Sequence, residues 1–272
     1  MKISISNIAW DKEEDAAVAS LLNKYGVNAI DIAPGKYFPD ILTTSHEQIE
    51  LVKSWWSQRG ITITGMQSLL FGTQGFNIFD DEDTRQKMLA HLTAICRIAA
   101  GTGATKLVFG SPKNRDRKQL SDAQVEKIAV SFFRELGNIA QYFGVVICLE
   151  PNPTHYGANF MTTALETACV VKAVNHAHIR MQLDTGAISL NKEKISTLLK
   201  EYQALIGHIH ISEPNLVPPT AKNGMHEILS SQLKKNLPEM YVTIEMLTDK
   251  KNRLNTIEQT LKFISAQYGE MQ

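Results

Sequence analysis

Short apolar runs alternate along the chain with longer stretches that have helical periodicity. Near-continuous Val, Ile and Leu residues are typical of strands that are buried on both faces of a parallel sheet. Strands that alternate with helices in this way predict an α/β fold with a parallel sheet. The eight strand-like runs are KISISNIAW, AIDIAP, ITITGMQSLL, KLVFGSP, VVICLEPNP, IRMQLDTGA, IGHIHISEP and YVTIEML.

Helix boundaries are marked between these runs. Gly60, Gly103 and Gly144 stand just before three of them, as residues that end a helix in the left-handed conformation often do. Eight strand–helix units fit the size of a (β/α)8 barrel, and no linker divides the chain. We therefore predict one TIM-barrel domain over residues 1–272, with its active site at the carboxyl ends of the strands. Predicted helix caps are Ser121 with Gln124, Thr163 with Glu166, Asn255 with Glu258, and Asn191 before KEKISTLLKEY.

Charge and composition narrow the class of partner. The chain carries 28 basic and 28 acidic residues. It therefore lacks the excess of positive charge expected of a protein that binds nucleic acid or a membrane surface. A small-molecule substrate is favoured instead. The sequence has no signal-peptide pattern and no run long enough to cross a bilayer, which predicts a cytoplasmic protein. Cys96, Cys148 and Cys169 lack CxxC spacing and are predicted to be reduced core thiols.

The last four strand-like runs carry the most informative pattern. Side chains alternate between the two faces of a strand, so one face of these runs is aliphatic and packs on helices while the other points into the barrel. Pro151 and Pro153 end the fifth run directly after its acidic residue. Four consecutive strands therefore direct these side chains to one place at the barrel mouth: Glu150, Asp184, His210 and Glu245.

Three carboxylates and an imidazole would repel one another unless a cation lies between them. Oxygen-rich ligands with one imidazole suit Mn²⁺ or Mg²⁺ first, with Co²⁺ or Zn²⁺ as further candidates, and one divalent ion is expected. The alternative is that Glu150 and Glu245 are exposed charges at strand ends, that Asp184 caps a turn and that His210 is a core histidine. All four lie on the same face of consecutive strands, which favours the metal site. Residues predicted to support the ligands from beneath are Gln182, His208 and Thr243.

The motifs LEPNP, QLDTG, HIHISEP and TIEM, in that order, resemble the xylose-isomerase-like sugar phosphate isomerase/epimerase superfamily, and the resemblance covers the whole chain. The pattern is closest to the ketose 3-epimerases, and it implies metal-ligand roles for the four residues above. The chain departs from those enzymes at two positions. Ala187 occupies the position of a substrate-binding histidine, and no arginine follows the HIS motif before Arg253.

Glu150 and Glu245 suit acid–base chemistry on a sugar. A metal at the carbonyl and hydroxyl oxygens would stabilise an enediolate while one glutamate removes a proton and the other returns it. The predicted enzyme is a metal-dependent isomerase, either an epimerase or an aldose–ketose isomerase. A lyase or dehydratase that uses the same enediolate and a non-catalytic sugar-binding barrel remain open alternatives. An apurinic endonuclease is disfavoured because its additional metal-binding histidines are missing.

Polar and aromatic residues near the strand ends are candidates for substrate contacts. The loop GSPKNRDRKQL adds several basic side chains, which predict a site for phosphate or carboxylate, although a solvated charge run is the competing interpretation. A homodimer or homotetramer is left open. The candidate substrate-binding residues are Trp10, Asp31, Gln67, Ser111, Lys113, Arg115, Asn152, Glu213 and His226.

Overall fold

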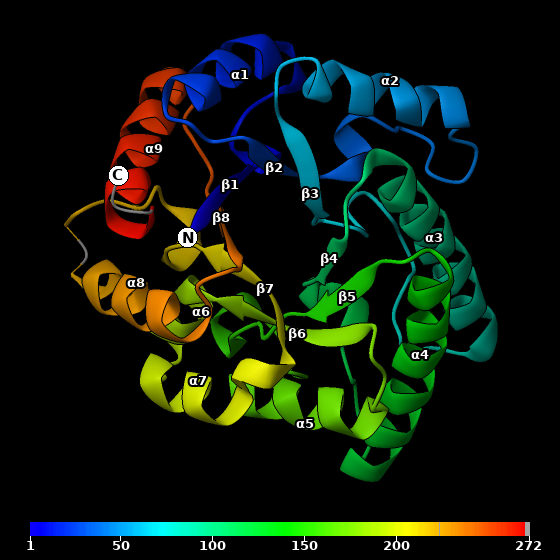
Figure 1. Cartoon of the computed structure of the whole chain (residues 1–272). Helices are drawn as coiled ribbons and strands as arrows, with labels where there is room; N and C mark the ends of the chain where they lie inside the picture. The colour runs from blue at the N-terminus through cyan, green and yellow to red at the C-terminus, as the bar shows by residue number, and fades with distance from the viewer. Residues whose placement is uncertain (223, 270–272) are drawn as a thin grey trace.

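The computed structural model describes residues 1–222 and 224–269, and within them eight parallel strands close into a barrel in chain order (Figure 1). The first strand pairs with the last in parallel, which closes the sheet and leaves no exposed edge. The predicted (β/α)8 TIM barrel is confirmed. The strands are β1 Lys2–Ser6, β2 Ala29–Ile32, β3 Thr62–Met66, β4 Lys106–Phe109, β5 Val146–Leu149, β6 Ile179–Asp184, β7 Ile206–Ile211 and β8 Tyr241–Ile244.

Helices surround the barrel on its outer side (Figure 1). In α4 the Ser121 side chain accepts from the Gln124 amide, as the capping-box spacing predicts, and Phe132, Phe133 and Leu136 form its buried stripe. The helices are α1 Asp15–Lys24, α2 His46–Ser57, α3 Glu82–Thr102, α4 Asp122–Tyr142, α5 Ala164–Val174, α6 Thr185–Leu190, α7 Ile195–Tyr202, α8 Met225–Asn236 and α9 Arg253–Tyr268.

Two of the predicted helix caps are wrong. Asn255 lies inside α9, which begins at Arg253 because that guanidinium is anchored to the carboxylate of Asp11 at 2.7 Å. Asn191 is the C-cap of α6 and donates to the carbonyl of Thr162 at 2.9 Å. A tertiary contact fixes each boundary more strongly than the local capping preference does.

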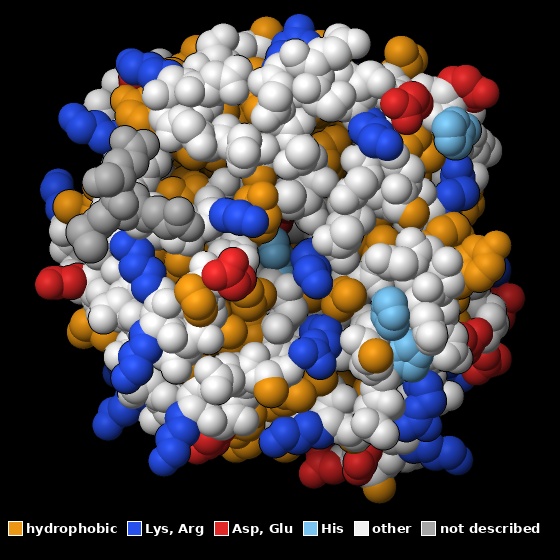
Figure 2. All heavy atoms as spheres, viewed as in Figure 1, with side chains coloured by type: hydrophobic (Ala, Val, Ile, Leu, Met, Phe, Trp, Pro, Cys, Tyr) orange, Lys and Arg blue, Asp and Glu red, His pale blue; other side chains and the backbone are white. Residues whose placement is uncertain are grey.

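The barrel interior is layered along its axis. At the strand starts, a cavity of about 650 Å³ is lined by Lys106 and Arg180 and reaches the buried His208. Figure 2 shows a hollow at the centre of the molecule with a histidine in its floor and Lys and Arg side chains around it. Gly207 keeps this layer open, because a Cβ there would lie 2.9 Å from the Cys148 sulfur. The acidic residues predicted to bind metal lie at the other end of the strands.

Among the residues described, no helix is long and apolar enough to cross a membrane. Two of the three thiols are buried as predicted, and burial raises the pKa of both Cys96 and Cys148 to about 12. The third prediction is wrong, since Cys169 is exposed. It lies on the outer face of α5, whose inner face is formed by Ala168 and Val171.

Candidate functional site

The structure brings the four predicted metal ligands together at the carboxyl ends of β5 to β8. One ligand atom from each of Glu150, Asp184, His210 and Glu245 lies within 4.8 Å of the others. Asp184 and His210 are register partners on adjacent strands. The Nδ1 atom of His210 lies 3.3 Å from Glu245 Oε2 and 3.8 Å from Glu150 Oε1, so this nitrogen faces the carboxylates. We call these four residues the upper group.

Neighbouring amides orient both glutamates. Gln67 Nε2 donates to Glu245 Oε1 at 2.6 Å, and Asn152 Nδ2 donates to Glu150 Oε2 at 3.0 Å. Each of these bonds engages one carboxylate oxygen and leaves the other directed at His210. Gly110 makes room for Glu150, because a Cβ at that position would lie 2.0 Å from Glu150 Oε2. The glutamates are thus held in place by residues of β3, β4 and β5 or the loops that follow them.

Asp184 is held from α6 and β7. Its Oδ1 accepts from the Ala187 amide at 2.6 Å, which makes it the N-cap of α6, and its Oδ2 accepts from Ser212 Oγ at 2.6 Å. Ser212 Oγ also accepts a hydrogen bond from the Gly186 amide at 2.9 Å. Sequence reasoning did not assign Ser212 a role. Its position on the same strand face as His208 and His210 was the available signal.

Burial and mutual repulsion shift the titration of the upper group. Burial and the charges of Glu245 and Asp184 raise the pKa of Glu150 to about 8. Burial and Glu245 likewise raise the pKa of Asp184 to about 6. Burial opposes the charge on His210, but Glu245 and Glu150 outweigh it and raise the pKa of His210 to about 10. The group therefore holds more negative charge than its single imidazole balances.

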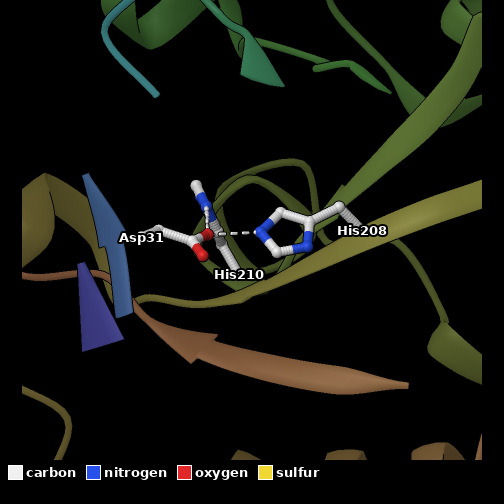
Figure 3. A group of neighbouring side chains, drawn as sticks. All are labelled: Asp31, His208 and His210. Carbon is white, nitrogen blue, oxygen red and sulfur yellow. Dashed lines mark hydrogen bonds and ion pairs between the residues drawn. The ribbon is translucent and has the colours of Figure 1, made fainter. Parts of the chain in front are cut away.

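Directly beneath, Asp31 and His208 form a second group that shares His210 (Figure 3). His208 Nε2 lies 2.6 Å from Asp31 Oδ2, and Thr64 Oγ1 donates to Asp31 Oδ1 at 3.0 Å. Burial favours the neutral acid, but the charge of His208 overcomes this and lowers the pKa of Asp31. We call Asp31 and His208 the lower pair. Their direct hydrogen bond leaves no gap for an ion between them.

The other predicted supporting residues also lie in this lower layer. Thr243 Oγ1 is 3.5 Å from His208 Nε2. Gln182 is fully buried, and with its amide oxygen toward β7 it accepts from the His210 amide at 3.2 Å. The second ring nitrogen of His210, Nε2, has no hydrogen-bond partner among the described residues, and Asp31 Oδ2 lies 3.9 Å from it. Asp31, which was predicted to contact substrate, is thus placed below the ligands with no exposed surface.

A cleft above the upper group has two lobes, of about 250 Å³ and 390 Å³. Glu150, Glu245 and Leu216 line both lobes, so the lobes meet at the two glutamates. Of the predicted substrate residues, the following line the cleft: Gln67, Ser111 and Lys113 in the smaller lobe, Asn152 and Glu213 in the larger. Sequence reasoning missed Phe71, which lines the smaller lobe from the loop after β3, and Tyr156, which lines the larger lobe from the 3-10 helix Thr154–Tyr156.

Four predicted substrate residues are absent from the cleft lining: Asp31, which lies below the ligands, Arg115, Trp10 and His226. Trp10 is 1% exposed, donates through Nε1 to Asp15 Oδ1 at 2.7 Å and packs edge-on against Trp56. The short 3-10 helix Asn7–Ala9 turns it inward, so its ring fills the core and does not reach the cleft. His226 is also 1% exposed, with its Nε2 atom 2.9 Å from Glu213 Oε1. It therefore lies behind Glu213, which does line the cleft.

The basic residues of the loop after β4 lie in two different environments, the surface and the interior. Arg117 and Lys118 form ion pairs with Asp122 and Asp80 on the surface. Arg115 lies in the 3-10 helix Pro112–Arg115 and is 1% exposed, unlike the other basic residues of this loop. The interpretation of this loop as a run of solvated charges therefore holds for Arg117 and Lys118, but it does not hold for the buried Arg115.

The donor set fits a hard divalent cation. Three carboxylates and one imidazole nitrogen converge, and three of the four positions are already fixed by hydrogen bonds from neighbours. Burial, and after it repulsion among the carboxylates, raises the pKa of Glu150 and of Asp184 despite the nearby His210. A cation between the carboxylates would supply a compensating positive charge, whereas the lower pair is already balanced.

Comparison with known proteins agrees with this architecture. Residues 19–267 match the family of xylose isomerase-like TIM barrels, and the chain belongs to that family. A D-psicose 3-epimerase from Ruminiclostridium cellulolyticum is 24% identical over 233 residues, which cover 80% of this chain and 74% of the relative.

Two solved structures share the fold closely. A D-psicose 3-epimerase with D-tagatose from Clostridium cellulolyticum H10 superimposes with a TM-score of 0.82 at 20% identity, covering 98% of this chain and 99% of that one. The IolI protein, determined with a bound zinc atom, has a TM-score of 0.74 at 17% identity, covering 99% of this chain and 100% of that one. Both likenesses concern the arrangement of the barrel.

Proposed function

We propose that this protein is a metal-dependent sugar epimerase or isomerase. The observation that carries the proposal is the upper group: four ligand atoms within 4.8 Å, two of them from glutamates that line both lobes of one cleft. The curated relative is a D-psicose 3-epimerase, which makes ketoses the first substrates to test. The family relationship and the site chemistry thus favour the same class of reaction.

The proposed cofactor is one divalent cation held by Glu150, Asp184, His210 and Glu245. Mn²⁺ and Mg²⁺ match the oxygen-rich ligands best, and Co²⁺ or Zn²⁺ is compatible with the imidazole. The IolI structure with zinc supports metal binding on this fold. When bound, the ion would stabilise the negative charge that develops on the carbonyl oxygen of the substrate.

The two glutamates are proposed to move the proton. A carboxylate can take up a proton as a general base and give it back as a general acid, and Glu150 and Glu245 both line the cleft where a substrate would bind. The charge of His210 overcomes the effect of burial and lowers the pKa of Glu245, which keeps that residue ionised as a proton acceptor. Because the two residues border the cleft from β5 and β8, one can remove the proton and the other can return it.

Neighbouring residues keep the glutamates in position for this step. Asn152 and Gln67 each bond one oxygen of a glutamate, so the carboxylates keep their orientation while their charge changes. Epimerisation returns the proton to the opposite face of the same carbon, whereas aldose–ketose isomerisation returns it to the adjacent carbon and also moves a hydroxyl proton to the former carbonyl oxygen.

The test is solvent deuterium uptake into a panel of ketoses, aldoses and sugar acids, beginning with D-psicose and D-fructose. Metal-free protein should be inactive, and adding Mn²⁺ or Mg²⁺ should restore both deuterium uptake and product formation. Uptake that is unaffected by chelation would contradict the metal-dependent reaction. Metal binding without uptake into any sugar would instead favour a non-catalytic binding barrel.

A further inference from the structure

The side chain of Arg115 is in an unusual state for an arginine. It is 1% exposed, and its Nε, Nη1 and Nη2 atoms find no hydrogen-bond partner among the described residues. A guanidinium carries five N–H donors and a permanent charge, and burying it without partners is costly. Burial lowers the pKa of Arg115 to about 10, so the group is still charged at neutral pH. This charge lacks the anion that would balance it by direct contact.

The turn that carries Arg115 is firmly held. Asn114 Nδ2 donates to the carbonyl of Phe76 at 2.7 Å, and the Asn114 carbonyl accepts from the Ile78 amide at 3.0 Å. On the other side, Asn159 Nδ2 donates to Asp116 Oδ1 at 2.7 Å. The backbone around Arg115 is therefore tied to two neighbouring loops, and its burial follows from this packing.

The same turn forms a wall of the cleft. Ser111 and Lys113 line the smaller lobe, and Pro112 lines the larger one. Arg115 itself lines neither lobe and is buried behind this wall, and the charge of Glu150 partly opposes the lowering of its pKa by burial. An unpaired buried cation therefore stands in the loop wall beside the proposed active site.

We infer that Arg115 is the receptor for an anionic group of the substrate, a carboxylate or a phosphate. The inference rests on the proposed function, because the anion is carried by the sugar whose proton the glutamates move. Bidentate pairing with a carboxylate or phosphate would satisfy the planar fork of the guanidinium. Lys113 and Ser111 on the same wall supply a second positive charge and a hydroxyl donor.

Access requires a small movement. The guanidinium is covered in the ligand-free protein, so the anion reaches it when the side chain turns from its buried position into the adjacent lobe. That movement exchanges an unpaired buried charge for a paired one, which favours substrates that carry an anion. Neutral sugars gain nothing from it. The preferred substrate class is therefore a sugar phosphate or a sugar acid.

The experiment compares wild type with Arg115→Met, which keeps the length of the side chain but removes its charge. Arg117→Met, in the same loop and paired to Asp122, is the matched control. Inorganic phosphate is added during thermal unfolding, and proton exchange is measured on paired phosphorylated, acidic and neutral sugars. Phosphate should raise the unfolding temperature of wild type and Arg117→Met, but not of Arg115→Met.

On the sugars, Arg115→Met should raise KM for one anionic class by about 10–100-fold, the range expected for hydrogen bonds to a charged group, while neutral sugars are unaffected. Which class is affected distinguishes phosphate from carboxylate. An equal loss on neutral and anionic sugars, or a phosphate response unchanged by Arg115→Met, would overturn the inference. If Arg115→Met does not fold, Arg115→Lys decides: a severalfold weaker phosphate response supports it and an unchanged response refutes it.

The proposed reaction and the proposed anion site at Arg115 can be rejected independently of each other. The phosphate response of the unfolding temperature requires no turnover, so it tests Arg115 even if no sugar exchanges a proton. Absence of exchange with every sugar, despite a phosphate response that depends on Arg115, would sink the proposed reaction but not the anion site. Exchange that is confined to neutral sugars would leave the reaction standing and reject the role of Arg115.

Discussion

The upper group and the lower pair both combine carboxylates with a histidine and both lie beside the ring of His210, yet they differ in charge balance. In the lower pair one carboxylate meets one imidazole at 2.6 Å, with a further hydrogen bond from Thr64. In the upper group three carboxylates face one imidazole, and the pKa of Glu150 is raised to about 8. The lower pair is complete without a ligand, whereas the upper group requires a positive charge from outside.

Burial alone does not explain this difference. Asp31 has no exposed surface and Asp184 is only 8% exposed, so both carboxylates lie in the protein interior. Asp31 has a lowered pKa because its charged partner outweighs burial, while Asp184 has a raised pKa because burial and Glu245 act together. The number and sign of neighbouring charges thus separate a structural ion pair from a candidate ligand site.

The largest effect should follow neutralisation of the reacting pair. Glu150→Gln and Glu245→Gln keep the side-chain shape but cannot accept a proton, so each should lower kcat by about 10²–10⁴-fold. The measurement is deuterium uptake into a confirmed substrate, with circular dichroism as the check of folding. Glu239→Gln, which alters a residue beside the cavity at the opposite end of the barrel, is the matched control. Near-normal exchange in either variant would remove that glutamate from the proton-transfer role.

The next largest effect concerns the charge balance within the lower pair and within the upper group, which two aspartate substitutions compare. Asp31→Asn leaves His208 without its charged partner and should lower the free energy of unfolding by about 3–5 kcal/mol. Asp184→Asn in metal-free protein removes one of three repelling carboxylates and should leave stability unchanged or raise it. Urea unfolding of both metal-free variants makes the comparison. Equal destabilisation by the two substitutions would contradict the distinction between the groups.

The stability of metal-free protein should depend on pH because of the excess negative charge in the upper group. The pKa of Glu150 rises from 4.5 to about 8 in the fold, and that of His210 rises from 6.5 to about 10. In both cases the folded protein retains its proton to a higher pH than the unfolded chain does. Stability should therefore fall as pH rises through the shared window from 6.5 to 8.

Added Mn²⁺ should reduce this fall, because the cation takes over the compensation that the protons provide. Thermal unfolding at a series of pH values, with and without Mn²⁺, measures the effect. A metal-free stability that rises across the window would contradict the raised pKa values. Asp31→Asn should leave the slope of the curve largely unchanged, since the pKa of Asp31 is lowered and its own contribution lies at more acidic pH.

The smallest effect concerns the residues that orient the ligands. Asn152→Ala removes the hydrogen bond to Glu150 and should weaken cation affinity by about 2–10-fold, which corresponds to roughly 0.5–1.5 kcal/mol. Calorimetric titration of the variant measures it. The lower pair should be unaffected, so the stability of the metal-free variant should stay close to that of wild type. A loss greater than 100-fold would mean that Asn152 does more than orient one oxygen.

The strands and the upper group could be predicted because both depend on a simple period. Alternation along β5 to β8 placed Glu150 and its partners on one face, and closure of the barrel brought them together. β2 is harder to interpret, since its register shifts between Ile30 and Asp31. The direct pairing of Asp31 with His208 across the barrel could not be deduced from a four-residue strand.

The walls of the cleft were predicted less well because loops decide them. The 3-10 helix after β1 turns Trp10 into the core, where sequence reasoning expected a ring at the mouth. Phe71 reaches the cleft through a loop in which Ser68 and Gly72 adopt positive φ angles. Such backbone conformations depend on contacts with neighbouring loops, and the hydrophobic pattern carries little information about them.

Titration of metal-free protein with Mn²⁺ measures whether the upper group binds a cation. We expect one ion per chain, a higher unfolding temperature, release of protons on binding near neutral pH, and loss of binding in Asp184→Asn but not in Asp31→Asn. Failure to bind Mn²⁺, Mg²⁺, Co²⁺ or Zn²⁺, or binding that survives Asp184→Asn and disappears in Asp31→Asn, would contradict a cation site at the upper group.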